Sequence, residues 1–198
     1  MYANERWFKD PESRRAAQGQ SKAVVDERGR ALFYHGTGGM QSPARYVLKS
    51  GSVLFRFARK GIAPKDGVTG AWWMSQESFQ KVSAMSQQSD ISIAMAARLL
   101  CCIPPEWSDM GTLMRAKVRE PLLAFRGLGR DVVISDKLGT HRLKAYNDIS
   151  ARRLYQLFIP GLRELAAQPS QRVVPGAIVP EQLWNIDVKA AARGFLYL

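Results

Sequence analysis

The sequence has no long apolar run. No stretch approaches the ~20 apolar residues that cross a bilayer, and residues 91–100 are interrupted by Ser92 and Arg98. The first residues include charged ones and lack an apolar core, which argues against a secretory signal peptide. We therefore expect no membrane partner. We expect a protein that acts in the cytoplasm or is delivered to another cell by a dedicated secretion machine.

Cysteine and histidine are scarce. Cys101 and Cys102 are the only cysteines, and neighbours in sequence rarely form a disulfide with each other. We interpret them as reduced core residues of an intracellular protein. His35 and His141 are the only histidines, and neither has the spacing of a zinc ligand. The sequence thus predicts neither a disulfide framework nor a metal site.

Negative charge is in short supply, with 17 Asp and Glu against 29 Lys and Arg, a net charge of +12. This excess favours an anionic partner such as nucleic acid, a phosphorylated cofactor or an acidic surface. An ordinary solvated basic surface explains it equally well. No basic run of the length typical of a tail occurs. Arg142, Lys144, Arg152 and Arg153 are candidates for a phosphate-binding face, with a solvated face as the alternative.

The remaining pattern is typical of one domain built from many short strands. Residues 1–22 are polar and predict an N-terminal arm, followed by a single domain over residues 23–198. Segments rich in β-branched and aromatic residues predict the strands; they are 23–25, 32–35, 52–57, 71–74, 113–118, 122–125, 131–134, 177–179 and 182–186. The fold class is therefore a compact α+β domain with a mostly antiparallel sheet and short helices.

Other segments predict helices or loops. Ser75 is expected to cap a helix that runs to Met85, with Glu77 in its first turn. Residues 40–50 predict a short helix or a loop, and 137–150 predict a loop. Residues 91–102 and 151–159 fit either a helix or a strand, because apolar periodicity alone does not separate the two.

The strand predicted at residues 32–35 ends in His35, and the next residue is Gly36. Gly36 allows close backbone approach, so its amide and carbonyl could grip the edge of a flat ligand, and Thr37 adds a hydroxyl. On these residues alone, an ordinary turn after a histidine explains the segment as well.

The surrounding residues carry a resemblance to a known family. Three segments carry this resemblance: Trp7-Phe8, Ser21-Lys22-Ala23-Val24-Val25-Asp26-Glu27-Arg28-Gly29 and Tyr34-His35-Gly36-Thr37. In them the chain resembles the ADP-ribosyltransferase domains of polyvalent proteins in phages and conjugative elements. Those domains open with Trp-Phe, Ser-Lys-Val-Val-Asp-x-x-Gly and Tyr-His-Gly-Thr. Here Ala23 replaces one Val. An insertion at residues 11–20 separates the Trp-Phe pair from the segments that follow it. The close resemblance covers the first fifth of the chain, and beyond it only isolated motifs match.

The resemblance implies a split-sheet domain that uses NAD as a substrate. It implies transfer of ADP-ribose to a macromolecular acceptor, protein or nucleic acid, with release of nicotinamide. In this scheme His35 contacts the ribose on the adenosine side, Gly36 clamps the nicotinamide carboxamide, and Thr37 lies beside them. Glu181, which leads the strand predicted at 182–186, stabilises the positive charge that develops on the ribose as nicotinamide leaves. Asp187 is the fallback acid.

A second family motif matches residues 70–79. It implies that Trp72 stacks on the nicotinamide ring and that the hydroxyls of Ser75 and Ser78 bond its carboxamide. Trp72 stands where the family has Tyr, so it can stack but offers no phenolic hydroxyl. The alternative is that Trp72 and Trp73 are an ordinary buried aromatic pair.

A rival site and rival functions remain open. Arg56, Ser75 and Glu181 could form the Arg-Ser-Glu arrangement of the other large ADP-ribosyltransferase branch, with Arg56 holding the NAD phosphates by a bidentate contact. The two sites are compatible. A catalytically degenerate scaffold that acts as a basic nucleic-acid-binding or target-protein-binding module is the alternative function, and a relative of the RNA 2′-phosphotransferases is a narrower variant.

Overall fold

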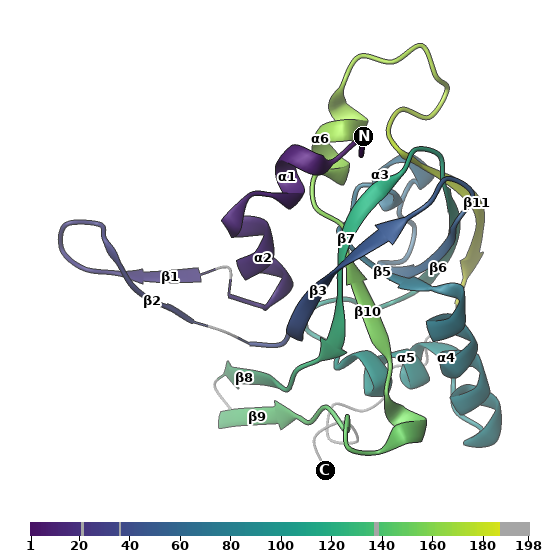
Figure 1. The fold of residues 1–198 in the computed structure, drawn as a ribbon. Helices are drawn as coiled ribbons and strands as arrows, with labels where there is room; N and C mark the ends of the chain where they lie inside the picture. The colour runs from purple at the N-terminus through teal and green to yellow at the C-terminus, as the bar shows by residue number, and fades with distance from the viewer. Residues whose placement is uncertain (21, 36, 137–138, 187–198) are drawn as a thin grey trace.

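The computed structural model describes residues 1–20, 22–35, 37–136 and 139–186. Seven strands form its central sheet: β3 (Met40–Leu48), β4 (Val53–Ala58), β5 (Trp72–Ser75), β6 (Thr112–Val118), β7 (Leu122–Gly129), β10 (Tyr155–Phe158) and β11 (Ile178–Asn185). Their order across the sheet is β11-β6-β4-β5-β10-β7-β3, and neighbouring strands run antiparallel (Figure 1).

Two hairpins and several short helices complete the described chain. The hairpins are β1 (Lys22–Val25) with β2 (Ala31–His35), and β8 (Val132–Asp136) with β9 (Gly139–Leu143). The helices are α1 (Glu5–Phe8), α2 (Pro11–Ala17), α3 (Pro64–Gly67), α4 (Gln76–Gln88), α5 (Ile93–Cys101) and α6 (Leu162–Ala167), with a 3₁₀ turn at Ser150–Arg152. The predicted α+β class, with an antiparallel sheet and short helices, is confirmed.

The sheet buries apolar side chains on both faces. Because successive side chains of a strand point to opposite faces, β4 contributes Leu54 to one core and Phe55 to the other. Leu54 packs in a cluster with Met114 and Leu157. Phe55 packs in a second cluster that includes residues of α4 and α5, and its ring stacks on Phe79 with centroids 4.0 Å apart. The two clusters thus define two faces of the sheet, called here the Leu54 face and the Phe55 face.

The sheet divides at β5. The second half of this strand pairs with β4, where Leu54 lies opposite Ser75 and Phe55 opposite Met74. Its first half pairs with β10 instead, through Trp72 and Trp73. Beyond Phe55, β4 keeps its pairing with β6. Arg56 is therefore the first residue of β4 past the point where the two halves of the sheet separate.

The helix predicted at residues 75–85 is confirmed. The Ser75 side chain caps α4 by accepting a hydrogen bond from the Ser78 amide at 3.2 Å, and Glu77 lies in the first turn. The ambiguous segment 91–102 is the helix α5, capped by Ser92. The other ambiguous segment, 151–159, contains the strand β10. Hydroxyl caps satisfy amides that have no partner within the helix.

Two predictions of local structure were wrong. Residues 40–50 form β3 rather than a helix or loop. This strand departs from regular pairing between Gln41 and Ala44, where Ser42 has a φ of 40° and Pro43 lacks an amide hydrogen, so its pattern does not look like a strand. The loop predicted at 137–150 contains β9, a polar strand that forms through its pairing with β8.

The C-terminal strands predicted at 177–179 and 182–186 are one strand, β11. A shift in its register between Pro180 and Gln182 places Glu181 at a bulge. The sequence shows this bulge as a gap between two strands because Pro180 interrupts the β-type pattern.

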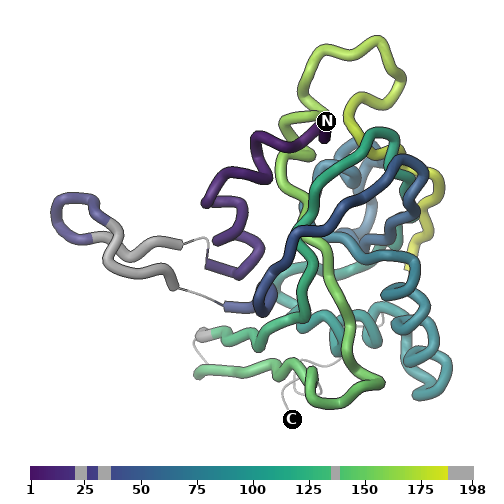
Figure 2. The backbone as a smooth tube through the Cα atoms, viewed as in Figure 1, coloured from purple at the N-terminus to yellow at the C-terminus, as the bar shows by residue number. Residues whose placement is uncertain are grey.

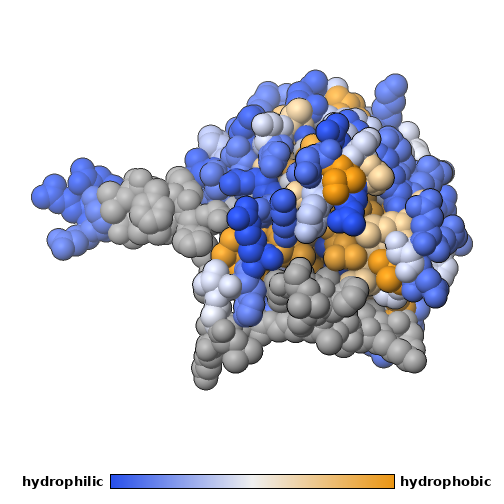
Figure 3. Space-filling model, turned by 90° about the horizontal axis from the view of Figure 1, so that it is seen from below, coloured by the Kyte–Doolittle hydropathy of each residue, from blue (hydrophilic) through white to orange (hydrophobic). Residues whose placement is uncertain are grey.

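The first 20 residues lie on the body of the protein. Asn4 is buried, and its side-chain amide donates to the carbonyls of Leu123 at 2.8 Å and Pro160 at 2.9 Å. Phe8 stacks on Phe125 with centroids 4.4 Å apart. The segment that projects from the body is the β1–β2 hairpin (Figures 1 and 2). Its tip, residues 26–30, is hydrophilic (Figure 3).

Candidate binding cleft at the division of the sheet

Arg56 enters a cleft on the Leu54 face. In the β4–β6 register Arg56 lies opposite Met114, a core residue of that face. Its guanidinium group occupies space that only a glycine leaves open, since a Cβ built on Gly70 would lie 1.1 Å from Arg56 Nη1. The Trp73 indole donates to the Gly70 carbonyl at 2.6 Å and so holds that loop. The guanidinium is therefore placed by backbone and packing.

The charge of Arg56 is poorly compensated by the protein. Its Nη1 donates to the Gly67 carbonyl at 3.3 Å, and its Cζ lies 5.9 Å from the centroid of the Trp73 ring. No described carboxylate lies within ion-pairing distance of it. Burial lowers the pKa of the Arg56 guanidinium to about 10, so it remains charged at neutral pH. A desolvated cation without a counter-ion is costly, and an anionic ligand would offset this cost.

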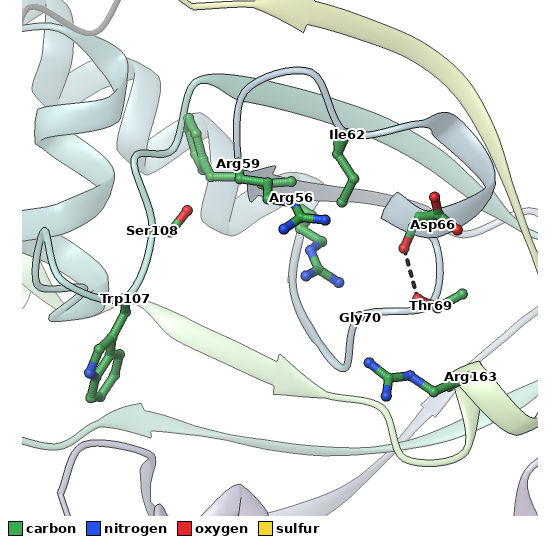
Figure 4. A pocket seen from close by; sticks show the side chains of 11 residues that line it. Arg56, Arg59, Ile62, Asp66, Thr69, Gly70, Trp107, Ser108 and Arg163 are labelled. Carbon is green, nitrogen blue, oxygen red and sulfur yellow. Dashed lines mark hydrogen bonds between the residues drawn. The ribbon is translucent and has the colours of Figure 1, made fainter.

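The cleft has a volume of about 640 Å³. This size lies within the ~300–1,000 Å³ that small-molecule sites occupy. Three guanidinium groups reach it, from Arg56 on β4, Arg59 just after β4 and Arg163 on α6, and Asp66 supplies a carboxylate (Figure 4). The lining residues are Arg56, Phe57, Ala58, Arg59, Ile62, Asp66, Thr69, Gly70, Trp107, Ser108 and Arg163.

An aromatic ring borders one end of this Arg56 cleft. Trp107 extends from the segment between α5 and β6, and 51% of its surface is exposed (Figure 4). The sequence suggests a packing anchor for this residue, but half of it faces solvent. Guanidinium groups bind phosphate oxygens, and an exposed indole can stack on a base. The cleft thus combines the two kinds of group that bind a nucleotide.

Two of the predicted binding residues serve the fold. Ser75 caps α4, and the Ser78 hydroxyl donates to the Tyr155 carbonyl at 2.7 Å, which joins α4 to β10. Trp72 lines a smaller cavity of about 60 Å³, which Arg56 also borders. Its ring meets Phe158 edge-on, with centroids 5.2 Å apart. Stacking of Trp72 on nicotinamide stays a prediction.

Glu181 is held on the other face of the sheet. Its Oε2 lies 2.6 Å from Nη1 of Arg115. Arg115 lies opposite Phe55 and follows Met114, which shares a face with Arg56. Because side chains alternate along β6, Arg115 and its partner Glu181 belong to the Phe55 face. The structure thus brings Arg56 and Ser75 onto neighbouring strands and leaves Glu181 two strands away from Arg56. Asp187 lies outside the described residues.

Just after the His-Gly-Thr segment, Gly38 adjoins the cleft residue Trp107. His35 ends β2, opposite Lys22, and Gly36 lies outside the described residues. The Thr37 hydroxyl donates to the Val133 carbonyl at 2.9 Å and accepts from its amide at 2.8 Å, so it anchors the segment to β8. A Cβ built on Gly38 would lie 2.9 Å from the Trp107 ring. Roles for His35, Gly36 and Thr37 toward NAD stay predictions.

The four basic residues considered as a phosphate-binding face differ from one another. Arg142 donates through Nε to Asp131 at 2.8 Å. Arg153 donates to the Asn147 carbonyl at 2.6 Å. The cationic groups of Lys144 and Arg152 lie over the Tyr146 ring, at 5.2 and 4.9 Å from its centroid.

The two cysteines are buried neutral thiols. Both are unpaired and buried, and burial raises the pKa of each thiol to about 12. Both are neutral thiols at pH 7, which are poor nucleophiles. Among the described residues no group of three or more His, Cys, Asp or Glu side chains is placed to hold a metal ion. In the same part of the chain, no helix is both long and apolar enough to cross a bilayer.

Sequence reasoning missed Arg59, Trp107 and Arg163 as parts of one site. They lie far apart along the chain and meet only because β4, the segment before β6 and α6 converge. The local signal for this site was the loop at residues 61–70, which is rich in Gly and Pro and comes shortly after Arg56 and Arg59. Such a loop permits close backbone approach to a ligand.

Comparison with known proteins adds a distant structural likeness. No protein-family model matches the chain, and no curated protein matches it. A solved structure described as "Rhs1-CT in complex with cognate immunity protein RhsI1" is similar at a TM-score of 0.42 and 13% identity, covering 80% of this chain and 89% of that one. A likeness at this level carries no conclusion about activity.

Proposed function

We propose that the chain binds NAD through the Arg56 cleft and acts as an ADP-ribosyltransferase. The observation that carries the binding part is the desolvated Arg56 guanidinium, which has no described counter-ion and opens into a cavity with Arg59 and Arg163. A pyrophosphate offers two adjacent anionic groups that match such a cluster. The transfer of ADP-ribose is what the family resemblance adds to this geometry.

The residues and the volume of the cleft suit a dinucleotide in charge and in size. Arg56, Arg59 and Arg163 would hold the phosphates, and Trp107 offers a ring for one base. Asp66 also lines the cleft, and we assign its carboxylate to a ribose hydroxyl. NAD itself supplies the bond to nicotinamide that the reaction breaks. The protein's part is to bind the phosphates and to orient the nicotinamide ribose.

The binding part is tested by calorimetric titration with NAD. Arg163→Gln removes one guanidinium from the cleft and should weaken NAD binding about 10-fold, the effect of losing one charge-assisted contact. Arg172→Gln is the matched control. That arginine is also exposed, but it pairs with Glu120 and lines a different cavity. Equal affinities in the two variants would contradict the assignment of NAD to this cleft.

The catalytic part is tested separately, by release of nicotinamide. Glu181→Gln and Asp66→Asn are compared because the resemblance assigns the carboxylate role to Glu181, whereas Asp66 lines the Arg56 cleft. A carboxylate that stabilises developing charge should lower turnover about 10²–10³-fold when neutralised, at nearly unchanged NAD affinity. If wild-type protein binds NAD and releases no nicotinamide, the transferase part is wrong and the chain is a binding module.

A further inference from the structure

We propose that an exposed surface centred on Arg126 binds single-stranded nucleic acid. This Arg126 surface consists of Tyr46 on β3, Arg126 on β7 and Tyr155 on β10, and it borders a hollow of about 400 Å³. It is distinct from the Arg56 cleft, and the inference does not depend on NAD binding.

The three side chains form a stack across neighbouring strands. Arg126 Cζ lies 3.8 Å from the centroid of the Tyr155 ring and 5.4 Å from that of Tyr46. The register explains this, since Arg126 lies opposite Ala44 on β3 and Leu157 on β10, each two residues from one of the tyrosines. Residues two apart on a strand share a face. The sheet therefore presents both rings and the guanidinium on one side.

Both rings keep part of their surface open to solvent. Tyr46 is 37% exposed and Tyr155 is 36% exposed. No described carboxylate forms an ion pair with Arg126. The surface thus offers a cation that is free to meet a phosphate and aromatic rings that are free to meet a base.

A second aromatic and basic group continues this surface along the chain. Tyr146, which is 39% exposed, lies beneath Lys144 and Arg152. Arg152 precedes Tyr155 by three residues, so their Cα atoms are at most about 11 Å apart. A flexible single strand bound at one group is therefore within reach of the other.

Single-stranded nucleic acid is the partner that fits this chemistry best. Bases of a single strand are unstacked and can lie on Tyr rings or on a guanidinium plane, whereas the bases of a duplex cannot. Arginine and lysine between the rings neutralise the phosphates that connect those bases. The net charge of +12 on the chain attracts any polyanion, but the alternation of rings and cations selects a strand with accessible bases.

The test is a fluorescence anisotropy titration of labelled oligo-dT, oligo-U and a duplex of the same length, at about 50 mM salt, where phosphate contacts are strong. We expect the single strands to bind more tightly than the duplex. Tyr155→Ala should weaken single-strand binding about 5-fold or more, the loss of one stacked base. Tyr155→Phe, which keeps the ring, should bind as the wild type does.

Charge is tested by a matched pair of variants. Arg126→Gln should weaken binding and reduce the slope of log affinity against log salt by about 0.7, the value for one phosphate contact on a single strand. Lys117→Gln removes the same charge from an exposed residue of β6, which three strands separate from β7, and should have little effect. Thermal unfolding confirms that each variant is folded.

Three results would overturn the inference. The first is no single-strand binding by the wild type at low salt. The second is equal or tighter binding of the duplex. The third is equal weakening by Arg126→Gln and Lys117→Gln, which would reduce the effect to general charge attraction.

Discussion

Arg56 and Arg115 lie on neighbouring strands of the same sheet and differ in how their charge is met. Arg115 pairs with Glu181 at 2.6 Å on the Phe55 face. Arg56 enters the Leu54 face, donates to a backbone carbonyl and has no described carboxylate partner. Its burial lowers its pKa to about 10, whereas Arg115 is 35% exposed along its side chain. One arginine is satisfied by the fold, and the other is held ready for an anion from outside.

This difference explains why the two arginines have different consequences for function. A paired, partly exposed arginine contributes little to stability and has little left to offer a ligand. A desolvated and uncompensated arginine reduces stability but strengthens binding of an anion, because its dehydration cost is already met in the folded protein. Under the proposed function, the energetic cost of burying Arg56 is offset when an anion binds in the Arg56 cleft.

The largest expected effect comes from the residue that makes room for Arg56. Gly70→Ala places a methyl group where the guanidinium lies, since the built Cβ is 1.1 Å from Nη1. Displacement of the guanidinium should weaken NAD binding 10- to 100-fold, the effect of losing charge-assisted hydrogen bonds. Calorimetric titration measures this loss.

A control and a second variant keep this result interpretable. Gly129→Ala meets only the flexible end of Gln156, at 2.8 Å, and should bind NAD as the wild type does. In an Arg56→Met background the Gly70→Ala change should cost little further stability, because the clash is with the guanidinium. If Gly70→Ala lowers the free energy of unfolding as much in that background as in the wild type, Gly70 acts through the backbone and not through Arg56.

A smaller effect is expected on the stability of the ligand-free protein. Arg56→Met removes an uncompensated buried charge and should leave the free energy of unfolding unchanged or raise it by about 1 kcal/mol. That gain corresponds to a Tm increase of about 2–4 °C for a chain of this size. Arg115→Met leaves Glu181 without its partner and should lower the free energy of unfolding by less than about 1 kcal/mol, which is a slight decrease in Tm.

Differential scanning calorimetry with and without NAD compares these variants. The wild type and Arg115→Met should show a rise in Tm with NAD, because a ligand that binds only the folded state stabilises it. Arg56→Met should show a clearly smaller rise at the same NAD concentration. A substantial loss of stability in ligand-free Arg56→Met would mean that Arg56 is a structural residue like Arg115.

The sequence was enough to predict the strands β4, β5 and β6, because their β-branched and aromatic residues are continuous. It did not predict β3, which has an irregular sequence pattern and forms by pairing with β7. It also did not predict β9, which has a polar pattern and forms by pairing with β8. The sequence singled out Arg56 only through the rival Arg-Ser-Glu arrangement, and its role as a phosphate ligand stays a prediction. The contribution of Arg163 depends on where α6 packs, which no local pattern encodes, and the pairing of Glu181 depends on a bulge that places it beside Arg115.

The smallest effect concerns the carboxylate of Asp131, which pairs with Arg142. Partial burial acts to raise the pKa of Asp131, but a hydrogen bond from the Ala145 amide and the Arg142 guanidinium outweigh it and hold the pKa below its usual value of 3.8. A carboxyl whose pKa is lowered by folding contributes stability above its unfolded pKa and loses it as pH falls through the folded value.

Asp131→Asn should therefore lower Tm at pH 7 by a small amount, and the difference from the wild type should shrink as pH falls below the usual value of 3.8 and through the lower folded pKa. Thermal unfolding by circular dichroism across this pH range measures it. A difference that persists unchanged at low pH would mean that the substitution acts through packing and not through charge.

The most direct test of the central claim is the affinity for NAD of three proteins measured side by side by calorimetric titration: the wild type, Arg56→Met and Arg115→Met. The account predicts that the wild type and Arg115→Met bind NAD equally well, and that Arg56→Met binds at least 10-fold more weakly, the loss of a charge-assisted contact to phosphate. If Arg56→Met retains wild-type affinity, or if both variants lose it to the same extent, the Arg56 cleft is not the site that binds NAD.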